Sequence, residues 1–251
     1  MSDFAQSVAA VEPDGGWRTH FQADVDVRLM KAAKIVALIG ADTLRGATVL
    51  EIGTGTGVIA EELARAVGPD GRLISIDTMD TRVAADGYTF QLTSGVELPF
   101  GENTFDIVIT NHVIEHVGDR TNQLVHLREI ARVLRRDGTG YLATPSRWAP
   151  IEPHFHVPAL SWPPRRLRDR YLRLTRKGKV YDVDPYGPRE MVKAIEAAGL
   201  TWRNATVDAL TEVGRIETPR GVKKWLTNAP APIKRAIRPL MPTMVFLVQP
   251  T

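Results

Sequence analysis

The sequence of 251 residues contains no cysteine. This absence excludes disulfide bonds, thiolate nucleophiles and zinc sites built on cysteine. No stretch approaches the roughly eighteen consecutive apolar residues of a transmembrane helix, so none is expected. The first residues, MSDFAQSVAAVEPDGGW, are acidic and lack the basic start and apolar core of a signal peptide. We therefore expect a protein of the cytoplasm.

A strong charge of one sign is also absent, because the formal net charge is only +3. Positive charge is concentrated locally, since residues 165–179 contain eight basic side chains and a single acid, Asp169. A nucleic-acid-binding domain usually shows a broad basic surface or a recognition motif. This sequence has one short patch and no such motif, so no nucleic-acid partner is expected.

Apolar runs of strand length alternate with segments of helical periodicity over residues 48–146. The strand-like runs are TVLEIG, GRLISID, TFQLTSG, FDIVITN and GTGYLATPS. Alternation of this kind predicts an α/β fold with a parallel sheet covered by helices on both faces. Further helices are expected over 23–40 and 188–199, and further strands over 201–210 and in PTMVFLVQP. The alternation lapses over 146–188, which reads as an insert rich in proline, arginine and aromatic residues.

The segment VLEIGTGTGVIAEELA is the strongest local signal. A buried strand leads through Gly53, Gly55 and Gly57 directly into a helix, and glycine lets the backbone approach a ligand closely. Ligands of such sheets bind beyond the carboxyl ends of the strands. Asp77 ends the next strand, where a carboxylate can accept hydrogen bonds from a ribose diol. Glu51 and Asp77 flank the loop and are therefore read as binding residues rather than as solvated strand-end acids.

The loop departs from the dinucleotide fingerprint G-x-G-x-x-G. Val58 stands where the last glycine would fall, and Glu51 precedes the loop. A carboxylate there would repel a pyrophosphate and attract an ammonium group. The residues thus favour a nucleoside ligand that carries a cation.

The chain resembles the class I S-adenosylmethionine-dependent methyltransferases. The segments that carry the resemblance are VLEIGTGTG, LISID, ELPFGENTFDIVITNHVIEHV and LREIARVLRRDGTGYLATPS. The resemblance implies a Rossmann-like fold with seven strands, mostly parallel, helices on both faces and a terminal antiparallel strand. It also implies S-adenosylmethionine as the cofactor. One domain is expected, divided into a helical cap (1–46), a cofactor-binding core (47–146), an insert over the acceptor pocket (147–188) and the C-terminal part of the sheet (189–251).

The resemblance also implies roles for individual residues. Glu51 would lie near the amino group of the methionine part, and Asp77 would take the ribose hydroxyls. Where many relatives carry an adenine-binding aspartate, this chain has Ser94. The implied cofactor-binding residues are Glu51, Gly53, Thr54, Gly55, Gly57, Asp77, Thr78, Met79, Ser94, Gly95, Val96 and Asn111. The acceptor pocket would include Trp17, His20, Arg147, Trp148 and Tyr186.

Histidines supply the candidate catalytic groups. His112 and His116 lie four residues apart in NHVIEHV, but no third ligand is close in sequence, so a metal site is not expected. His116 is read as lining the mouth of the site, either structurally or as a base. His154 and His156 stand between prolines, which should hold the chain extended and direct both rings to one side. There they would contact the acceptor or accept its proton.

The arginine-rich part of the insert predicts an amphipathic helix, because Leu167, Tyr171 and Leu174 recur at helical spacing. Three interpretations stay open for it. It could be a solvated cap over the pocket, a peripheral membrane contact through residues 160–179, or a site for an anionic substrate.

The sequence therefore predicts a methyltransferase acting on a small molecule, most simply at a hydroxyl oxygen, since the histidines offer a base. Nitrogen and carbon acceptors stay open, as does a lipid-linked or polyprenyl substrate met at a membrane surface. A non-catalytic cofactor- or partner-binding module is the alternative from another class. A nicotinamide-dependent oxidoreductase is disfavoured by the loop spacing and by Glu51. The sequence does not indicate an oligomeric state.

Overall fold

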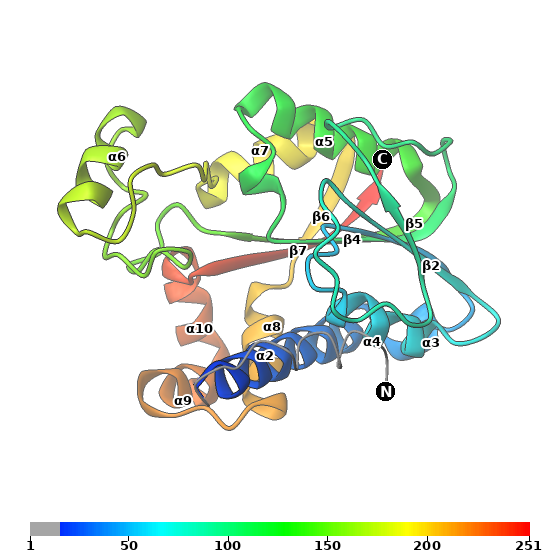
Figure 1. Cartoon of the computed structure of the whole chain (residues 1–251), viewed down its shortest axis with the longest axis horizontal. Coiled ribbons are helices and arrows are strands. Elements are labelled where there is room, and N and C mark those ends of the chain that lie inside the picture. The colour runs from blue at the N-terminus through cyan, green and yellow to red at the C-terminus, as the bar shows by residue number, and fades with distance from the viewer. Residues whose placement is uncertain (1–15) are drawn as a thin grey trace.

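The computed structural model describes residues 16–251 of the chain, with side chains from residue 25 onward. A seven-stranded sheet forms its centre, in the order β3-β2-β1-β4-β5-β7-β6 (Figure 1). The strands are β1 (Thr48–Ile52), β2 (Arg72–Asp77), β3 (Thr89–Leu92), β4 (Phe105–Asn111), β5 (Leu134–Pro145), β6 (Leu200–Asn204) and β7 (Thr243–Pro250). Strand β7 runs antiparallel to both β5 and β6, while the other neighbouring pairs are parallel. The predicted Rossmann-like fold with a terminal antiparallel strand is confirmed.

Helices cover both faces of the sheet. Figure 1 shows α2, α4 and α8 on one side and α5 and α7 on the other. The helices are α2 (Gly16–Ile39), α3 (Ala41–Leu44), α4 (Val58–Val67), α5 (Arg120–Val133), α6 (Arg165–Leu174), α7 (Pro188–Ala197), α8 (Thr206–Ile216), α9 (Gly221–Asn228) and α10 (Ala231–Ile237), with short 3-10 turns η1 (Ile114–His116) and η2 (Arg238–Leu240). Within residues 16–251, none of these helices is both long and apolar enough to cross a membrane.

Alternation along the strands divides the core into two layers. Val49 faces the layer under α2 and α4, and its neighbour Leu50 faces the layer under α5 and α7. In the same way, Ile107 and Val108 of β4 point to opposite layers. Successive strand residues point to opposite faces, so a parallel strand with two covered faces needs an unbroken apolar run. This is why TVLEIG and FDIVITN lack the polar alternation of a half-exposed strand.

One expected strand is shorter than its sequence suggested. Residues 201–210 were predicted as a strand, but β6 ends at Asn204 and helix α8 begins at Thr206. The side-chain oxygen of Asn204 accepts a hydrogen bond from the Thr206 amide at 3.1 Å, and such local side-chain bonds favour helix starts. The strand prediction was wrong for the second half of this segment.

The insert has a small hydrophobic cluster of its own. Its buried members are Val157, Leu160, Leu172, Tyr181 and Val183. Figure 1 shows α6 standing at one end of the molecule, beyond the sheet. The apolar face predicted for α6 does not pack inward, because Leu167 and Leu174 are 45% and 75% exposed. The helix instead buries Arg168 and Leu172.

Candidate active site

A cavity of about 730 Å³ opens at the carboxyl ends of β1, β2 and β4. This is within the usual size of a small-molecule site, about 300–1,000 Å³. Nine of the residues predicted to bind the cofactor line it: Glu51, Gly53, Thr54, Gly55, Asp77, Thr78, Gly95, Val96 and Asn111. The position agrees with the rule that ligands of open α/β sheets bind where the strands end.

Glycine is required in the loop between β1 and α4 because of backbone conformation and space. Gly53, Gly55 and Gly57 all have positive φ, at 88°, 51° and 80°. A Cβ on Gly57 would lie 2.0 Å from the carbonyl oxygen of Ala84, and one on Gly53 would lie 2.4 Å from a methyl of Val113. Gly57 therefore packs the loop against residue 84 and lies outside the cavity lining, and its cofactor contact stays a prediction.

Asp77 fixes the glycine loop through its carboxylate. One oxygen accepts a hydrogen bond from the Gly55 amide at 2.8 Å, and the other accepts one from the Thr78 amide at 2.7 Å. The carboxylate lines the cavity, where its remaining lone pairs can accept hydroxyl protons. It thus connects the end of β2 to the loop after β1.

Glu51 lies at the base of the cavity and is 3% exposed. Its carboxylate accepts a hydrogen bond from the Ser75 hydroxyl at 2.6 Å, and Ser75 bonds in turn to the Thr54 hydroxyl at 2.6 Å. Burial raises the pKa of Glu51 to about 8, although the Ser75 hydrogen bond opposes the shift. A cationic ligand group would offset this cost, because a nearby positive charge favours the ionised carboxylate. The buried acid fits an ammonium group.

A second polar group lies beside the cavity, on η1 and the insert. The rings of His116 and His154 meet edge to face, with centroids 5.1 Å apart. Burial lowers the pKa of His116, whereas the hydrogen bond to Glu152 raises the pKa of His154. His116 lines the cavity. Two imidazoles with opposite pKa shifts, one lining the pocket and the other packed against it, are typical of acid–base chemistry.

Glu152 is the buried anchor that positions His154. Its Oε1 lies 2.7 Å from Nδ1 of His154, and its Oε2 accepts hydrogen bonds from the amides of His154 and Phe155. The chain turns here, because Glu152 pairs with Val157 and His156 has a φ of 53°. The prediction of an extended segment with both histidines on one side was wrong. Within the described residues, no hydrogen bond, ion pair or ring contact joins the His156 imidazole to this group.

The buried carboxylate of Glu115 lies close to the rings of His112 and His154. It is 1% exposed, and one carboxylate oxygen accepts a hydrogen bond from Thr144 at 3.0 Å. The other lies 3.3 Å from Nδ1 of His112 and 3.8 Å from Nε2 of His154. Burial opposes its ionisation, but the interaction with His112 keeps the pKa of Glu115 below its usual value.

One ligand atom from each of His112, Glu115 and His154 lies within 4.8 Å of the others. This spacing fits a divalent cation, and sequence reasoning did not find the set because His154 is distant in the chain. The expectation that the protein uses no metal stays a prediction.

Other predicted residues lie elsewhere. Met79 and Ser94 are exposed and lie outside the cavity lining. Tyr186 is 5% exposed and belongs to the core under α5, so it packs rather than lines a pocket. Trp148 is half-exposed and stacks edge to face with Trp162. The side chains of Trp17 and His20 lie outside the described residues.

Sequence reasoning missed several residues of the cavity. Arg28 and Lys31 reach it from α2, and His126 reaches it from α5. Burial lowers the pKa of His126 to about 4. Arg28 and Lys31 lie on a helix that was expected to cap the core, and this was the only sign that they could reach the site. Helical periodicity alone does not show which face of such a helix meets a pocket.

Residues 50–142, which supply the loop, Glu51, Asp77 and η1, match the family model described as a methyltransferase domain. Over these residues the chain is similar to the class I S-adenosylmethionine-dependent methyltransferases, as the sequence resemblance implied. S-adenosylmethionine, the family's cofactor, fits the site, because the molecule combines a ribose for Asp77 with an ammonium group for the buried Glu51.

Individual relatives agree with this family. The chain is 30% identical over 172 residues to a ubiquinone biosynthesis O-methyltransferase of Rhizobium etli, covering 65% of this chain and 63% of the relative. It is 32% identical over 104 residues to a ubiquinone/menaquinone biosynthesis C-methyltransferase of Hahella chejuensis, covering 37% of this chain and 41% of the relative. The chain thus spans less than two thirds of the length of these relatives.

A solved structure shares the fold. An S-adenosylmethionine-dependent methyltransferase from Mesorhizobium loti superposes with a TM-score of 0.53 and 14% identity, covering 82% of this chain and 92% of that chain.

Replacing Asp77 should weaken cofactor binding while the sheet stays intact. In Asp77→Ala, the ribose loses its acceptor and the Gly55 amide loses its partner, so we expect at least a tenfold weaker affinity for S-adenosylhomocysteine. Isothermal titration calorimetry measures this, and circular dichroism checks the fold. Asp80→Ala, on the exposed loop after β2, is the matched control. An unchanged affinity in Asp77→Ala would contradict the assignment.

The buried Glu51 should make cofactor binding depend on pH. The empty site holds this group protonated below a pKa of about 8, and an ammonium ligand favours the carboxylate, so binding releases a proton. The affinity for S-adenosylhomocysteine should rise between pH 6 and 8, by at most about tenfold per pH unit.

Glu51→Gln should remove this dependence. A second control is 5′-methylthioadenosine, which lacks the ammonium group and whose affinity should stay level over the same range. If the wild type binds S-adenosylhomocysteine equally at pH 6 and pH 8, Glu51 does not face the ammonium group.

Proposed function

We propose that this protein transfers the methyl group of S-adenosylmethionine to a hydroxyl oxygen of a small molecule. The observation that carries the proposal is the pair His116 and His154, which meet beside the cofactor cavity with opposite pKa shifts. When bound, the cofactor supplies a methyl group activated on a sulfonium. The chain must then align the acceptor, exclude water and accept the hydroxyl proton.

His116 is the base in this proposal. Burial lowers its pKa, so the ring is neutral near pH 7 and can accept a proton at a ring nitrogen. His154, which Glu152 holds in place, has a raised pKa and is protonated more readily, and in that form it would stabilise the oxygen as it loses its proton. Glu115 lies 3.8 Å from Nε2 of His154 and would stabilise that charge.

A phenolic hydroxyl is the first choice of acceptor. The Rhizobium etli relative is named an O-methyltransferase of ubiquinone biosynthesis, and the Hahella chejuensis relative a C-methyltransferase. A base beside the cavity favours oxygen, because a hydroxyl must lose a proton during transfer. The same base is compatible with an activated ring carbon, which also loses a proton, so product analysis must distinguish the two.

Replacing His116 should reduce turnover without loss of cofactor affinity. A panel of phenols, aliphatic alcohols and amines is screened with labelled S-adenosylmethionine, and the methylated atom is assigned by mass spectrometry and NMR. On the best acceptor, His116→Asn should lower kcat by about 10²–10⁴-fold, as expected for a lost base. Calorimetry with S-adenosylhomocysteine should show nearly unchanged binding.

His156→Asn is the matched control, because asparagine tolerates the positive φ of that position. It should keep kcat within about twofold. An equal loss in both variants would remove His116 from the chemistry. Dialysis against a chelator should also leave turnover unchanged. Activity lost there and restored by a divalent cation would assign His112, Glu115 and His154 to metal binding instead.

A peripheral membrane contact is a second candidate, favoured by the outward face of α6. Leu167 and Leu174 are exposed there among the exposed Arg166, Arg170 and Arg173. Exposed leucines between arginines suit a membrane surface, where apolar side chains enter the lipid and basic ones meet anionic headgroups. The acceptor would in that case be a lipid-linked molecule drawn from the membrane.

Sedimentation with phosphatidylglycerol vesicles tests this contact. The wild type should sediment with the vesicles at low salt and be released at high salt, because the attraction is partly electrostatic. The double variant Leu167→Glu, Leu174→Glu should stay in solution, whereas Leu92→Glu, at an exposed leucine of β3, should sediment normally. A wild type that never sediments excludes the contact.

A further inference from the structure

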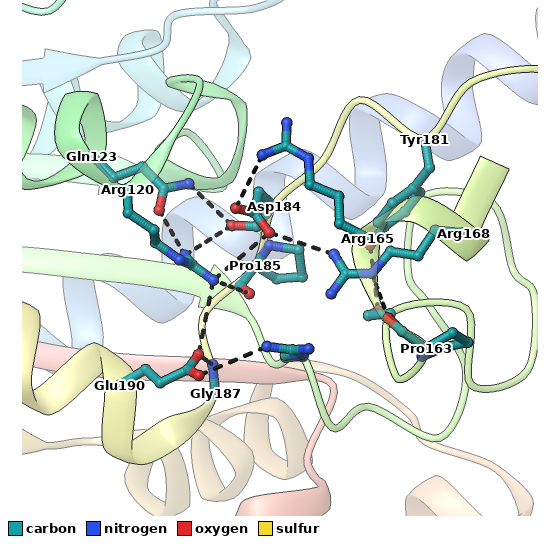
Figure 2. Close-up of polar contacts among 12 residues, drawn as sticks. Arg120, Gln123, Pro163, Arg165, Arg168, Tyr181, Asp184, Pro185, Gly187 and Glu190 are labelled. Atoms are coloured by element: carbon teal, nitrogen blue, oxygen red, sulfur yellow. Dashed lines mark hydrogen bonds and ion pairs between the residues drawn. The ribbon is translucent and has the colours of Figure 1, made fainter.

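Four arginines converge on two carboxylates between α5, α6 and α7. Figure 2 shows Asp184 surrounded by the guanidinium groups of Arg120, Arg165 and Arg168, with Glu190 on the far side of Arg120. Arg147, which follows β5, forms the fourth member through Glu190. We call these six residues the arginine cluster. Two positive charges in it are not matched by an acid of the cluster.

The ion pairs of the arginine cluster are all long. Arg168 approaches Asp184 at 3.4 Å, and the other pairs measure 3.7–3.8 Å. A direct charge-assisted pair usually closes to about 2.7–2.9 Å and is often bidentate for arginine. Asp184 is shared among three guanidinium groups and satisfies none of them fully. The two acids therefore hold the arginines near one another without neutralising them.

Arg120 has a structural role in the cluster. Its guanidinium donates to the side chain of Gln123 and to the carbonyls of Asp184 and Pro185, and it lies 3.8 Å from the ring centroid of Tyr186. These contacts fix the strand-like segment that carries Asp184. The remaining arginines, 147, 165 and 168, have capacity left for another partner.

Arg168 and Arg147 show the imbalance most clearly. Arg168 is 2% exposed, and burial together with the charge of Arg147 lowers its pKa. The Nε of Arg147 is shielded from solvent and has no hydrogen-bond partner among residues 25–251. A buried donor without an acceptor is costly and rare in native proteins, unless a ligand supplies the acceptor.

The arginine cluster adjoins the candidate active site. The Asp184 amide donates to the carbonyl of Glu115 at 2.9 Å, so the segment rests on η1 directly behind His116. Gly118 lines the cofactor cavity, and Arg120 follows two residues later. Next to Arg147, the rings of Trp148 and Trp162 form a half-exposed aromatic surface. A molecule on this surface would have its charged end at the arginines.

We propose that the arginine cluster binds an anionic group of the methyl acceptor, a carboxylate or a phosphate attached to an apolar or aromatic body. The partly exposed Arg147 supplies the donors, Arg165 adds charge at the entrance, the buried Arg168 adds positive charge behind them, and the two tryptophans contact the body. The proposal rests on the proposed function, because it treats this surface as the acceptor side of the methyltransferase site. The proposal narrows the class of possible acceptors from any compound with a hydroxyl group to one that also carries an acidic group on an apolar body.

Calorimetry on the full chain saturated with S-adenosylhomocysteine tests the proposal. The probes are benzoate and phenyl phosphate, with benzamide and benzyl alcohol as neutral counterparts of similar shape. At low salt the anionic probes should bind at least tenfold more tightly than the neutral ones, and high salt should reduce the difference. Equal binding of anionic and neutral probes would overturn the proposal.

Arg147→Gln should weaken phenyl phosphate binding at least tenfold, because it removes the partly exposed donor without emptying the core of the insert. Arg165→Gln, at an exposed position, should weaken it less. Arg166→Gln is the matched control. Arg166 lies on α6 next to Arg165, its replacement removes the same charge, and it makes no ion pair with Asp184 or Glu190. If Arg166→Gln weakens binding as much as Arg147→Gln, the site is not the arginine cluster.

Two further readouts separate this proposal from the proposed function and from lipid binding. Each variant should keep the wild-type affinity for S-adenosylhomocysteine. A wild type that does not bind S-adenosylhomocysteine would refute the proposed function and not the anion site. The vesicle assay is repeated with Arg147→Gln, which should still sediment. Sedimentation lost in Arg147→Gln, together with no binding of the free probes, would assign the anion to a lipid headgroup and overturn the proposal.

Discussion

The contact between the insert and the sheet depends on one buried carboxylate, that of Glu115. It receives a hydrogen bond from Thr144 on β5 and lies against His112 and His154, while its own backbone carbonyl accepts the Asp184 amide. A charge removed from water is tolerated only where partners surround it. The partners of Glu115 come from the sheet, from the turn between β4 and η1, and from the insert. The position of the insert on the sheet is therefore coupled to the ionisation of this single group.

Two buried glutamates, one on each side of the site, have opposite pKa shifts. Burial dominates at Glu51, whose pKa rises to about 8, because its near neighbours are hydroxyl groups. At Glu115 burial is again the largest single influence, but the interactions with His112, a backbone hydrogen bond and His116 together lower the pKa. Glu51 has hydroxyl groups as its hydrogen-bonding neighbours, so an ammonium ligand would supply a positive charge beside it, whereas Glu115 already lies beside His112 and His154. This difference distinguishes the two ends of the site.

Most of the fold and the cofactor half of the site could be predicted from the sequence. Local sequence patterns determine these features, which are the loop with Gly53 and Gly55, the acid Asp77, and the order of strands and helices. Such patterns can be recognised without knowing the tertiary contacts. The acceptor half could not be predicted in the same way. The turn at Glu152 that separates His154 from His156 depends on side-chain bonds to three groups, and the convergence of Arg120, Arg147 and Arg168 joins segments far apart in the chain. Helical periodicity also misled at α6, where tertiary contacts buried Arg168 and left Leu167 exposed.

The insert's own hydrophobic cluster has a consequence for how this enzyme can change over evolutionary time. Val157, Leu160 and Leu172 pack with Tyr181 and Val183 rather than with the two layers of the sheet. Substitutions there should perturb the insert as a local cooperative unit and leave the sheet largely unaffected. The protein can accumulate changes in the apolar packing of the insert while the packing beneath the glycine loop stays as it is. Such changes would reach the sheet mainly through the contacts of the insert with Glu115 and Arg120.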